Sequence, residues 1–247
     1  MIEKKRENLK QSRTTVPSYL SNTAFVLAQD GNEYDVISRS HSDSISRKNF
    51  RTLKPEKWLS DEVIHMFLHI LVQSCRHKRN IYPNQTHLNI HAFKSFFFTK
   101  LQQGNEYSYD NVRRFSRYVH QENIFNLSRL LIPTNVNNNH WALLDIHFES
   151  KRIEYLDSLG NPSGNYTTYA FRYLKDEHLN KFNSPLPDSR EWTLVDNNLN
   201  TPRQENGYDC GVFVCLFAEA LANGERPYFT RNEIHYSRLW IAHAINV

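Results

Sequence analysis

Residues 204–224 read QENGYDCGVFVCLFAEALANG, a polar turn followed by an almost continuously apolar run. The run ends at Asn223-Gly224, a combination typical of a helix C-terminus. Because its apolar residues would cover every face of a helix, we expect a central, buried helix over 211–221. Cys210 then lies at, or one residue before, the start of that helix.

A cysteine in this position has two interpretations. The N-terminus of a helix offers unpaired N–H groups and the positive end of the helix dipole. Both favour a thiolate at Cys210 over a thiol, and Gly211 leaves the same N–H groups accessible to a developing oxyanion. Against this, a single cysteine at the start of an apolar helix is commonly a small buried hydrophobe.

The remaining elements predict an α+β fold. Apolar residues at helical spacing follow Ser60, a residue that caps helices, and Asp61 and Glu62 in the first turn. Further helices are expected over 86–101, from Asp110 onward and over 166–180, and strands over 129–136, 141–148, 152–159 and 191–195. Helices and strands in this order favour a mixed architecture over a doubly wound sheet.

The first 48 residues have a different composition, rich in Ser, Lys, Arg and Asn. Two β-prone runs flank Asp30-Gly31, which indicates a hairpin. We therefore divide the chain into a variable N-terminal arm with a hairpin, residues 1–48, and one catalytic domain, residues 49–247.

A base and an acid for Cys210 are suggested by the neighbouring strands. His140 precedes the strand WALLDI, and Asp157 ends the strand RIEYLD. A tight turn between two antiparallel strands brings the start of the first beside the end of the second, so both side chains should lie at one edge of the sheet. Each has an ordinary alternative, a structural histidine and a turn-forming aspartate, and these residues alone leave both interpretations open.

Four segments resemble the ubiquitin-like-protein-specific peptidases, the SUMO and neddylation proteases of the CE clan. They are LKPEKWLSDEVIHMFL, NNHWALLDI, IEYLDSLG and RQENGYDCGVFVC, and the resemblance extends over about residues 50–222. It implies a papain-like cysteine protease domain with a central mixed β-sheet flanked by helices. It also implies that Cys210 is the nucleophile, His140 its general base, Asp157 the group that orients His140, and Gln204 a donor to the oxyanion.

The resemblance also assigns a substrate channel. Trp58 and Trp141 match the two indoles that enclose a narrow tunnel for a C-terminal Gly-Gly, where only glycine is thin enough to pass. Asp209 and Gly211, on either side of the cysteine, are expected to contact the same substrate. The family often has a small residue where this chain has Tyr208, a departure that leaves the catalytic residues unchanged.

Composition limits the other functions. The chain has 30 Lys and Arg against 26 Asp and Glu, and neither a phosphate-binding loop nor a dinucleotide fingerprint occurs. Its three cysteines form no CxxC pair, which suits a reducing compartment. His65 and His69 have the i, i+4 spacing of a zinc helix but lack the glutamate of that motif, so we expect no metal and no cofactor.

We therefore expect a monomeric thiol protease, cytoplasmic or nuclear, that binds a ubiquitin-like modifier and its conjugates, with no nucleic-acid partner and no membrane span. The modifier could be ubiquitin, SUMO or the neddylation modifier. The Asn- and Lys-rich composition suits a bacterial effector secreted into a host cell, for which ubiquitin is the favoured substrate. Two alternatives stay open: an acetyltransferase effector with the same catalytic residues, and a non-catalytic modifier-binding module.

Overall fold

The computed structural model describes residues 31–246 except 41–42, 84–86, 104–105 and 197. Its centre is a five-stranded sheet in the order β3-β6-β7-β8-β9. The inner pairs β6–β7 and β7–β8 are antiparallel, whereas the outer pairs β3–β6 and β8–β9 are parallel, so the sheet is mixed. The strands are β3 (Ile90–Ala92), β6 (Arg129–Val136), β7 (His140–His147), β8 (Arg152–Leu156) and β9 (Thr193–Val195).

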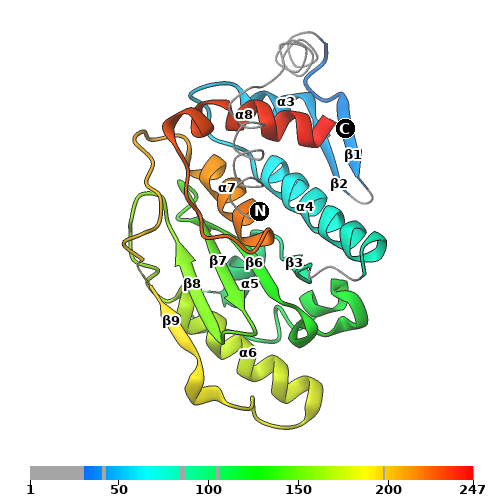
Figure 1. Ribbon diagram of the computed structural model, residues 1–247, viewed down its shortest axis with the longest axis vertical. Coiled ribbons are helices and arrows are strands. Elements are labelled where there is room, and N and C mark those ends of the chain that lie inside the picture. The colour runs from blue at the N-terminus through cyan, green and yellow to red at the C-terminus, as the bar shows by residue number, and fades with distance from the viewer. Residues whose placement is uncertain (1–30, 41–42, 84–86, 104–105, 197, 247) are drawn as a thin grey trace.

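Helices cover both faces of this sheet (Figure 1). On one face α7 (Cys210–Ala222) packs against the strands, α4 (Asp61–Ile81) lies beside it and contacts β3, and α8 (Arg231–Asn246) packs against both helices. On the other face lie α5 (Phe96–Leu101) and α6 (Tyr166–Phe182). Strand alternation explains the two cores, because Leu131 and Leu143 face α7 while their neighbours Leu130 and Leu144 face α5 and α6. The α+β prediction, with a central mixed sheet flanked by helices, is confirmed.

Helix α7 is the buried helix that its apolar sequence predicts. Every residue of α7 except Glu219 is buried. It begins at Cys210, one residue earlier than the predicted range, and this places the cysteine in the first turn. The core thus fixes the position of Cys210 relative to the sheet.

The N-terminal elements pack onto the same core. β1 (Val36–Ser40) and β2 (Asp43–Ser46) form an antiparallel pair, followed by the short helices α3 (Arg47–Phe50) and η1 (Arg51–Leu53). Ile45, Phe50 and Leu53 are buried in the cluster that contains α4, α7 and α8. The division at residue 48 therefore stays a prediction, and it falls inside α3.

The predicted hairpin at Asp30-Gly31 is only partly within the described residues. Its first run, 24–29, lies outside them. The second run contributes β1, and the partner that the structure gives β1 is β2, which follows it in the chain.

Two helix predictions were wrong. Over 87–95 the chain contains strand β3, and helix α5 starts only at Phe96, because Ile90–Ala92 pair with β6 and tertiary pairing overrides local helical spacing. After Asp110 the chain forms turns and short 3-10 helices instead of one long helix. These are η2 (Phe115–Tyr118), η3 (His120–Glu122) and η4 (Ile124–Asn126), interrupted by left-handed residues at Gln121 and Glu122.

The other predicted elements lie close to their expected bounds. Ser60 caps α4 by accepting a hydrogen bond from the N–H of Val63, as its sequence indicates. Helix α8 was not predicted. The remaining short elements are β4 (Gln102–Gln103), β5 (Glu106–Tyr107) and η5 (Ser189–Glu191). Among the described helices, none is both long and apolar enough to cross a membrane.

Candidate active site

Cys210 lies where the first turn of α7 meets the segment that precedes α4. Its side chain is buried, with 2% of its surface exposed. Gly211 allows the close approach, because a Cβ atom built on it would lie 2.9 Å from Cβ of Leu59. The absence of a side chain at Gly211 thus brings the Leu59 segment against the start of α7, beside the sulfur.

His140 and Asp157 meet at one edge of the sheet, as their strand positions predicted. His140 is the first residue of β7, and Asp157 follows β8, which pairs antiparallel with β7. Nε2 of His140 lies 2.8 Å from Oδ1 of Asp157, and both residues are buried. Cys210 lies close enough to the imidazole to contribute, with Asp157, to raising the pKa of His140. The three side chains therefore lie together at the start of α7, with His140 bonded to Asp157.

A tight turn holds Asp157 in place. Its Oδ1 also accepts hydrogen bonds from the N–H groups of Leu159, at 2.7 Å, and Gly160, at 3.2 Å. Gly160 has a φ of +83°, a backbone conformation that other residues rarely adopt. Nη1 of Arg203 donates to the backbone oxygen of Asp157 at 2.6 Å. The carboxylate that faces His140 is thus fixed from both its side chain and its backbone.

This environment changes the acidity of His140. Burial alone would lower its pKa, but the hydrogen bonds and charges of Asp157 and Cys210 outweigh burial and raise the pKa to about 9. The imidazole is therefore protonated at neutral pH. A protonated imidazole beside a cysteine sulfur stabilises a thiolate.

Gln204 is held beside Asp157 by the residue that follows the aspartate. The backbone N–H of Gln204 donates to the carbonyl of Ser158 at 2.9 Å, and the hydroxyl of Ser158 donates to Oε1 of Gln204 at 2.5 Å. Nε2 of Gln204 donates to the carbonyl of Asn206 at 2.6 Å. A primary amide has two N–H donors, so one remains for a substrate oxygen.

The two predicted tryptophans differ in exposure but are linked through one segment. Trp58 is 50% exposed and donates from Nε1 to the carbonyl of Gly207 at 2.8 Å. Trp141 is 6% exposed and donates from Nε1 to the carbonyl of Leu59 at 3.2 Å. The segment of Trp58 and Leu59 is therefore hydrogen-bonded to the turn before Cys210 through Trp58 and to strand β7 through Leu59.

Sequence reasoning missed Arg238 in α8, which connects both of these regions. Its guanidinium donates to Oδ1 of Asp209 from Nη2, at 2.6 Å, and from Nε, at 3.1 Å. It also donates to four backbone carbonyl oxygens, those of Thr52, Lys54, Lys57 and Tyr208. Asp209, which was expected to contact substrate, thus forms an ion pair with Arg238. Both residues are buried, since Asp209 is 8% exposed and Arg238 is 7% exposed. No local pattern identified Arg238, because its partners lie far away in the chain.

The turn before Cys210 is shaped by Asn206, a second residue that was not singled out. Its Oδ1 accepts from the N–H groups of Tyr208 and Asp209, and its Nδ2 donates to Oδ2 of Asp209. Side chains of this type commonly bond the backbone two residues on. The Asn-Gly pair was therefore the available signal for this role.

Cys215, Cys75 and His65 lie in surroundings that fit structural roles. Burial raises the pKa of the Cys215 thiol, and burial has the same effect on Cys75. Nε2 of His65 is 2.9 Å from the N–H of Ser95 and 3.0 Å from its hydroxyl. Across the described part of the chain, no group of three or more His, Cys, Asp or Glu side chains is placed to hold a metal ion.

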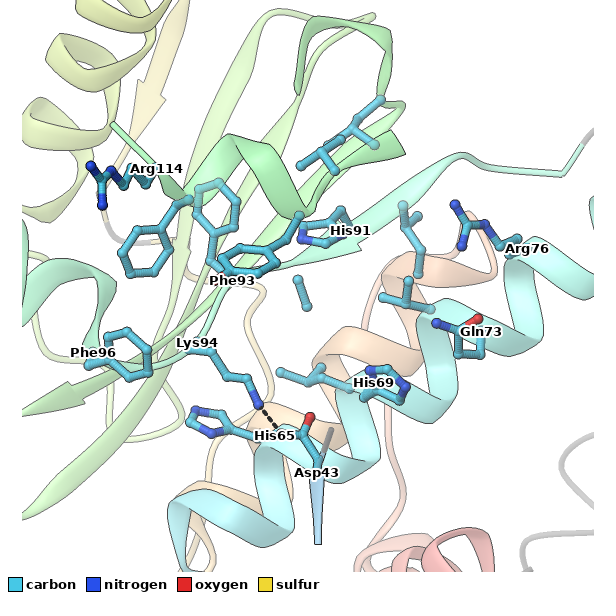
Figure 2. A pocket seen from close by; sticks show the side chains of 18 of the residues that line it. Asp43, His65, His69, Gln73, Arg76, His91, Phe93, Lys94, Phe96 and Arg114 are labelled. Atoms are coloured by element: carbon cyan, nitrogen blue, oxygen red, sulfur yellow. Dashed lines mark hydrogen bonds and ion pairs between the residues drawn. The ribbon is translucent and has the colours of Figure 1, made fainter. Parts of the chain in front are cut away.

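A large cavity of about 1040 Å³ lies away from Cys210, between α4, β3 and the start of α5 (Figure 2). Burial and nearby cations lower the pKa of His65 and His91 to about 4, so both are neutral at physiological pH. The charge of the cavity therefore comes from its other lining residues. Most of the charged residues that line the cavity are basic, namely Arg76, Arg79, Lys94, Lys100, Arg113 and Arg114.

Comparison with known proteins identifies the family. Residues 57–246 match the model of the Ulp1 protease family, C-terminal catalytic domain. The human protein "Sentrin-specific protease 2" is 33% identical over 205 residues, which is 83% of this chain and 32% of that protein. "Ubiquitin-like-specific protease 1" of Saccharomyces cerevisiae is 33% identical over 177 residues, 70% of this chain and 24% of that protein. The chain thus spans about a third or less of the length of these curated relatives.

Solved structures agree with this assignment. The C-terminal Ulp1 protease domain, solved in complex with Smt3, the yeast ortholog of SUMO, has a TM-score of 0.75 and 25% identity. The match covers 94% of this chain and 95% of that one. The predicted resemblance is confirmed, and the chain belongs to the Ulp1 protease family.

Proposed function

We propose that this chain is a cysteine protease that hydrolyses the peptide or isopeptide bond after the C-terminal Gly-Gly of a SUMO-like modifier. The observation that carries the proposal is the hydrogen-bonded pair of Asp157 and His140 beside Cys210, at the start of a buried helix. Several relatives are named as sentrin-specific or SUMO proteases, and this favours SUMO over the ubiquitin that composition suggested.

The first half of the reaction forms a thioester. The sulfur of Cys210 attacks the carbonyl carbon of the terminal glycine, and the carbonyl π electrons move onto oxygen. Backbone N–H groups at the start of α7 and the free N–H of Gln204 stabilise that oxyanion. When the oxyanion reforms the carbonyl, the C–N bond breaks, and His140 gives its proton to the departing amine.

The second half restores the enzyme. Neutral His140 takes a proton from water, and the resulting hydroxide attacks the thioester carbon. Collapse of the second tetrahedral intermediate breaks the C–S bond, releasing the modifier with a free carboxylate and the sulfur as a thiolate. Asp157 keeps Nε2 of His140 occupied through the cycle, which leaves the other ring nitrogen for proton transfer at Cys210.

Selectivity for Gly-Gly is proposed to come from the segment of Trp58 and Leu59. Cys210 is almost fully buried, so the scissile bond must reach it through a narrow approach. The indole of Trp58 is held by the carbonyl of Gly207, and the indole of Trp141 by the carbonyl of Leu59 in this segment. Residues with a Cβ atom would be too wide to lie between such walls.

The globular body of the modifier is proposed to lie over the basic cavity of Figure 2. This cavity is lined along α4, whose first residue, Asp61, lies three residues after Trp58. Phe96 and Tyr118, which line it, are 43% and 77% exposed, as is common for apolar contact residues. Complementary charge predicts that an acidic surface of the modifier faces the cavity.

The alternatives are distinguished by what reacts with the thioester. An acetyltransferase would pass its acyl group from Cys210 to a hydroxyl or amine of a target, whereas the protease passes it to water. A binding module would not require His140 to be bonded to Asp157 beside Cys210, and this arrangement argues against it.

The test uses a SUMO precursor with a short extension after Gly-Gly, incubated with the full chain. We expect cleavage after the second glycine, and a precursor with Ala in place of the first glycine as a matched, slowly cleaved control. A ubiquitin precursor with the same extension measures the modifier preference. Faster cleavage of ubiquitin would overturn the SUMO assignment, and no cleavage of any modifier together with acetyl transfer would overturn the protease.

A further inference from the structure

The charges that line the cavity of Figure 2 are not balanced. Lys94 pairs with Asp43 at 2.6 Å, and Arg113 lies 3.9 Å from Asp110. These two aspartates are the only acidic side chains among the described residues of the lining. The other four basic residues have no carboxylate partner within the described part of the chain, and they are Arg76, Arg79, Lys100 and Arg114. The lining therefore carries an excess of positive charge.

The arginines of this set can be reached from solvent. Arg76 and Arg114 are exposed, and Arg79 is half-buried. Figure 2 shows Arg76 and Arg114 on opposite sides of His91 and Phe93. The first belongs to α4, and the second lies in the turn before η2. A molecule in the cavity could therefore contact cations on two walls.

Helix α4 brings like charges together on one of these walls. Arg76 and Arg79 are three residues apart and so lie on the same side of the helix. Burial and the charge of Arg76 lower the pKa of Arg79, and the same two causes lower the pKa of His91. Like charges at neighbouring positions of a helix destabilise it. An anion bound between them would offset this repulsion.

The groups on this wall suit phosphate. A guanidinium donates two parallel N–H groups to phosphate oxygens and stays charged throughout the physiological pH range. His91 is neutral, because its pKa is lowered to about 4, and a neutral imidazole still has one N–H to donate. The cavity volume of about 1040 Å³ lies at the upper end of the range for small-ligand sites, so the cavity has room for more than one phosphate group.

We propose that this cavity binds a small molecule that carries two or more phosphate groups. One group would accept hydrogen bonds from Arg76 and Arg79 on α4, and another would accept them from Arg114. Because His91 and Phe93 lie between these arginines in Figure 2, a single phosphate would serve only one wall.

The consequence for activity rests on the proposed function, which places an acidic surface of the modifier over the same cations. A bound polyphosphate would neutralise them and compete with the modifier. It should therefore raise KM for a SUMO precursor and leave kcat unchanged, because Cys210 lies away from this cavity.

The direct test measures binding of inorganic tripolyphosphate to the full chain by isothermal titration calorimetry. The ionic strength is set to roughly 0.15 M, where long-range attraction is largely screened. We expect saturable binding of one tripolyphosphate per chain. Orthophosphate, the matched probe with a single phosphate group, should bind at least about tenfold more weakly because it contacts only one wall. Absence of saturable binding, or equal binding of orthophosphate, would overturn the proposal.

Three variants locate the site. Arg76→Gln and Arg114→Gln, changes at exposed residues on the two walls, should each weaken tripolyphosphate binding by about tenfold. Lys78→Gln is the matched control, because Lys78 is exposed on the same helix but does not line the cavity. It should keep the affinity within about twofold. An equal loss in Lys78→Gln would show attraction to surface charge in general and would contradict a site in the cavity.

Kinetics separate this site from the position proposed for the modifier. Cleavage of the SUMO precursor is measured with and without saturating tripolyphosphate, and we expect a rise in KM that is absent in Arg76→Gln. Saturable binding without any rise in KM would keep the polyphosphate site and contradict the placement of the modifier over it. Loss of binding itself overturns the site whatever the kinetics.

Discussion

Helix α7 carries two cysteines, Cys210 and Cys215, whose surroundings have different effects on their acidity. Cys210 begins α7 beside His140, whose pKa is raised to about 9, while Cys215 lies farther along, where burial raises the pKa of its thiol. Burial does not separate them, because they are 2% and 0% exposed. The comparison indicates that an ionised partner and a helix terminus, rather than access to solvent, favour a thiolate.

Removing the sulfur of Cys210 should cause the largest loss of activity, and removing that of Cys215 should not. Cys210→Ala should lower the rate of SUMO-precursor cleavage by at least about 10⁴-fold, because the nucleophile is lost. Cys215→Ala, the matched control, should leave the rate within about twofold while lowering unfolding stability by roughly 1 kcal/mol for a lost methyl-sized group. Turnover assays and thermal unfolding separate the two, and equal losses of activity would show that the cysteines are not functionally distinct.

Removing the charge beside His140 should have the next largest effect. Asp157→Asn keeps the size of the side chain but withdraws the negative charge that raises the pKa of His140. We expect a loss of about 10²- to 10⁴-fold in kcat/KM, comparable with the same change in other catalytic triads. Leu159 and Gly160 also bond this side chain, so circular dichroism must show an intact fold. A loss below about tenfold would remove Asp157 from the orienting role.

Gln204 tests the oxyanion site without changing the cysteine. Gln204→Ala should lower kcat by about 10²- to 10³-fold, the usual loss for one oxyanion donor. Ser158→Ala is a useful control, since it removes the bond that fixes Oε1 of Gln204 but retains the donor. It should cost less than Gln204→Ala. The reverse order would mean that Gln204 serves only to hold the turn.

The acidity of His140 predicts the alkaline side of the pH profile. Its pKa is raised to about 9, so the proton for the leaving amine is present below that value and lost above it. Cleavage should fall about tenfold per pH unit above pH 9. The free energy of unfolding depends on pH with the same sign. The stability that the raised pKa of His140 contributes is complete below about pH 6.5 and is lost as the pH rises through 9. In Asp157→Asn the alkaline limb should move to lower pH, and an unmoved limb would assign it to another group.

The smallest expected effect concerns the support of the site by α8. Arg238→Lys keeps a positive charge beside Asp209 but cannot make all the bonds that link it to the Trp58 and Tyr208 segments. We expect KM for the precursor to rise by roughly fivefold with a smaller change in kcat, which steady-state kinetics will measure. A fall in kcat alone would instead point to displacement of Cys210.

Local patterns were sufficient for much of the fold and the site. The apolar run after Cys210 predicted α7, and the strand ends predicted the meeting of His140 and Asp157, because both depend on residues near each other in sequence. The helix predicted over 86–101 failed because pairing with β6, a distant strand, decides the structure of 90–92. The role of Arg238 was invisible for the same reason, since its partners lie up to 186 residues away.

The most direct test of the account is the site of covalent labelling by a SUMO probe with an electrophile in place of its terminal carboxylate. We predict one adduct, located by peptide mass spectrometry on Cys210, and none after Cys210→Ala. We also predict that a ubiquitin probe of the same chemistry reacts more slowly. An adduct on Cys215 or Cys75, or no adduct while the protein remains folded, would contradict the assignment of Cys210 as the nucleophile.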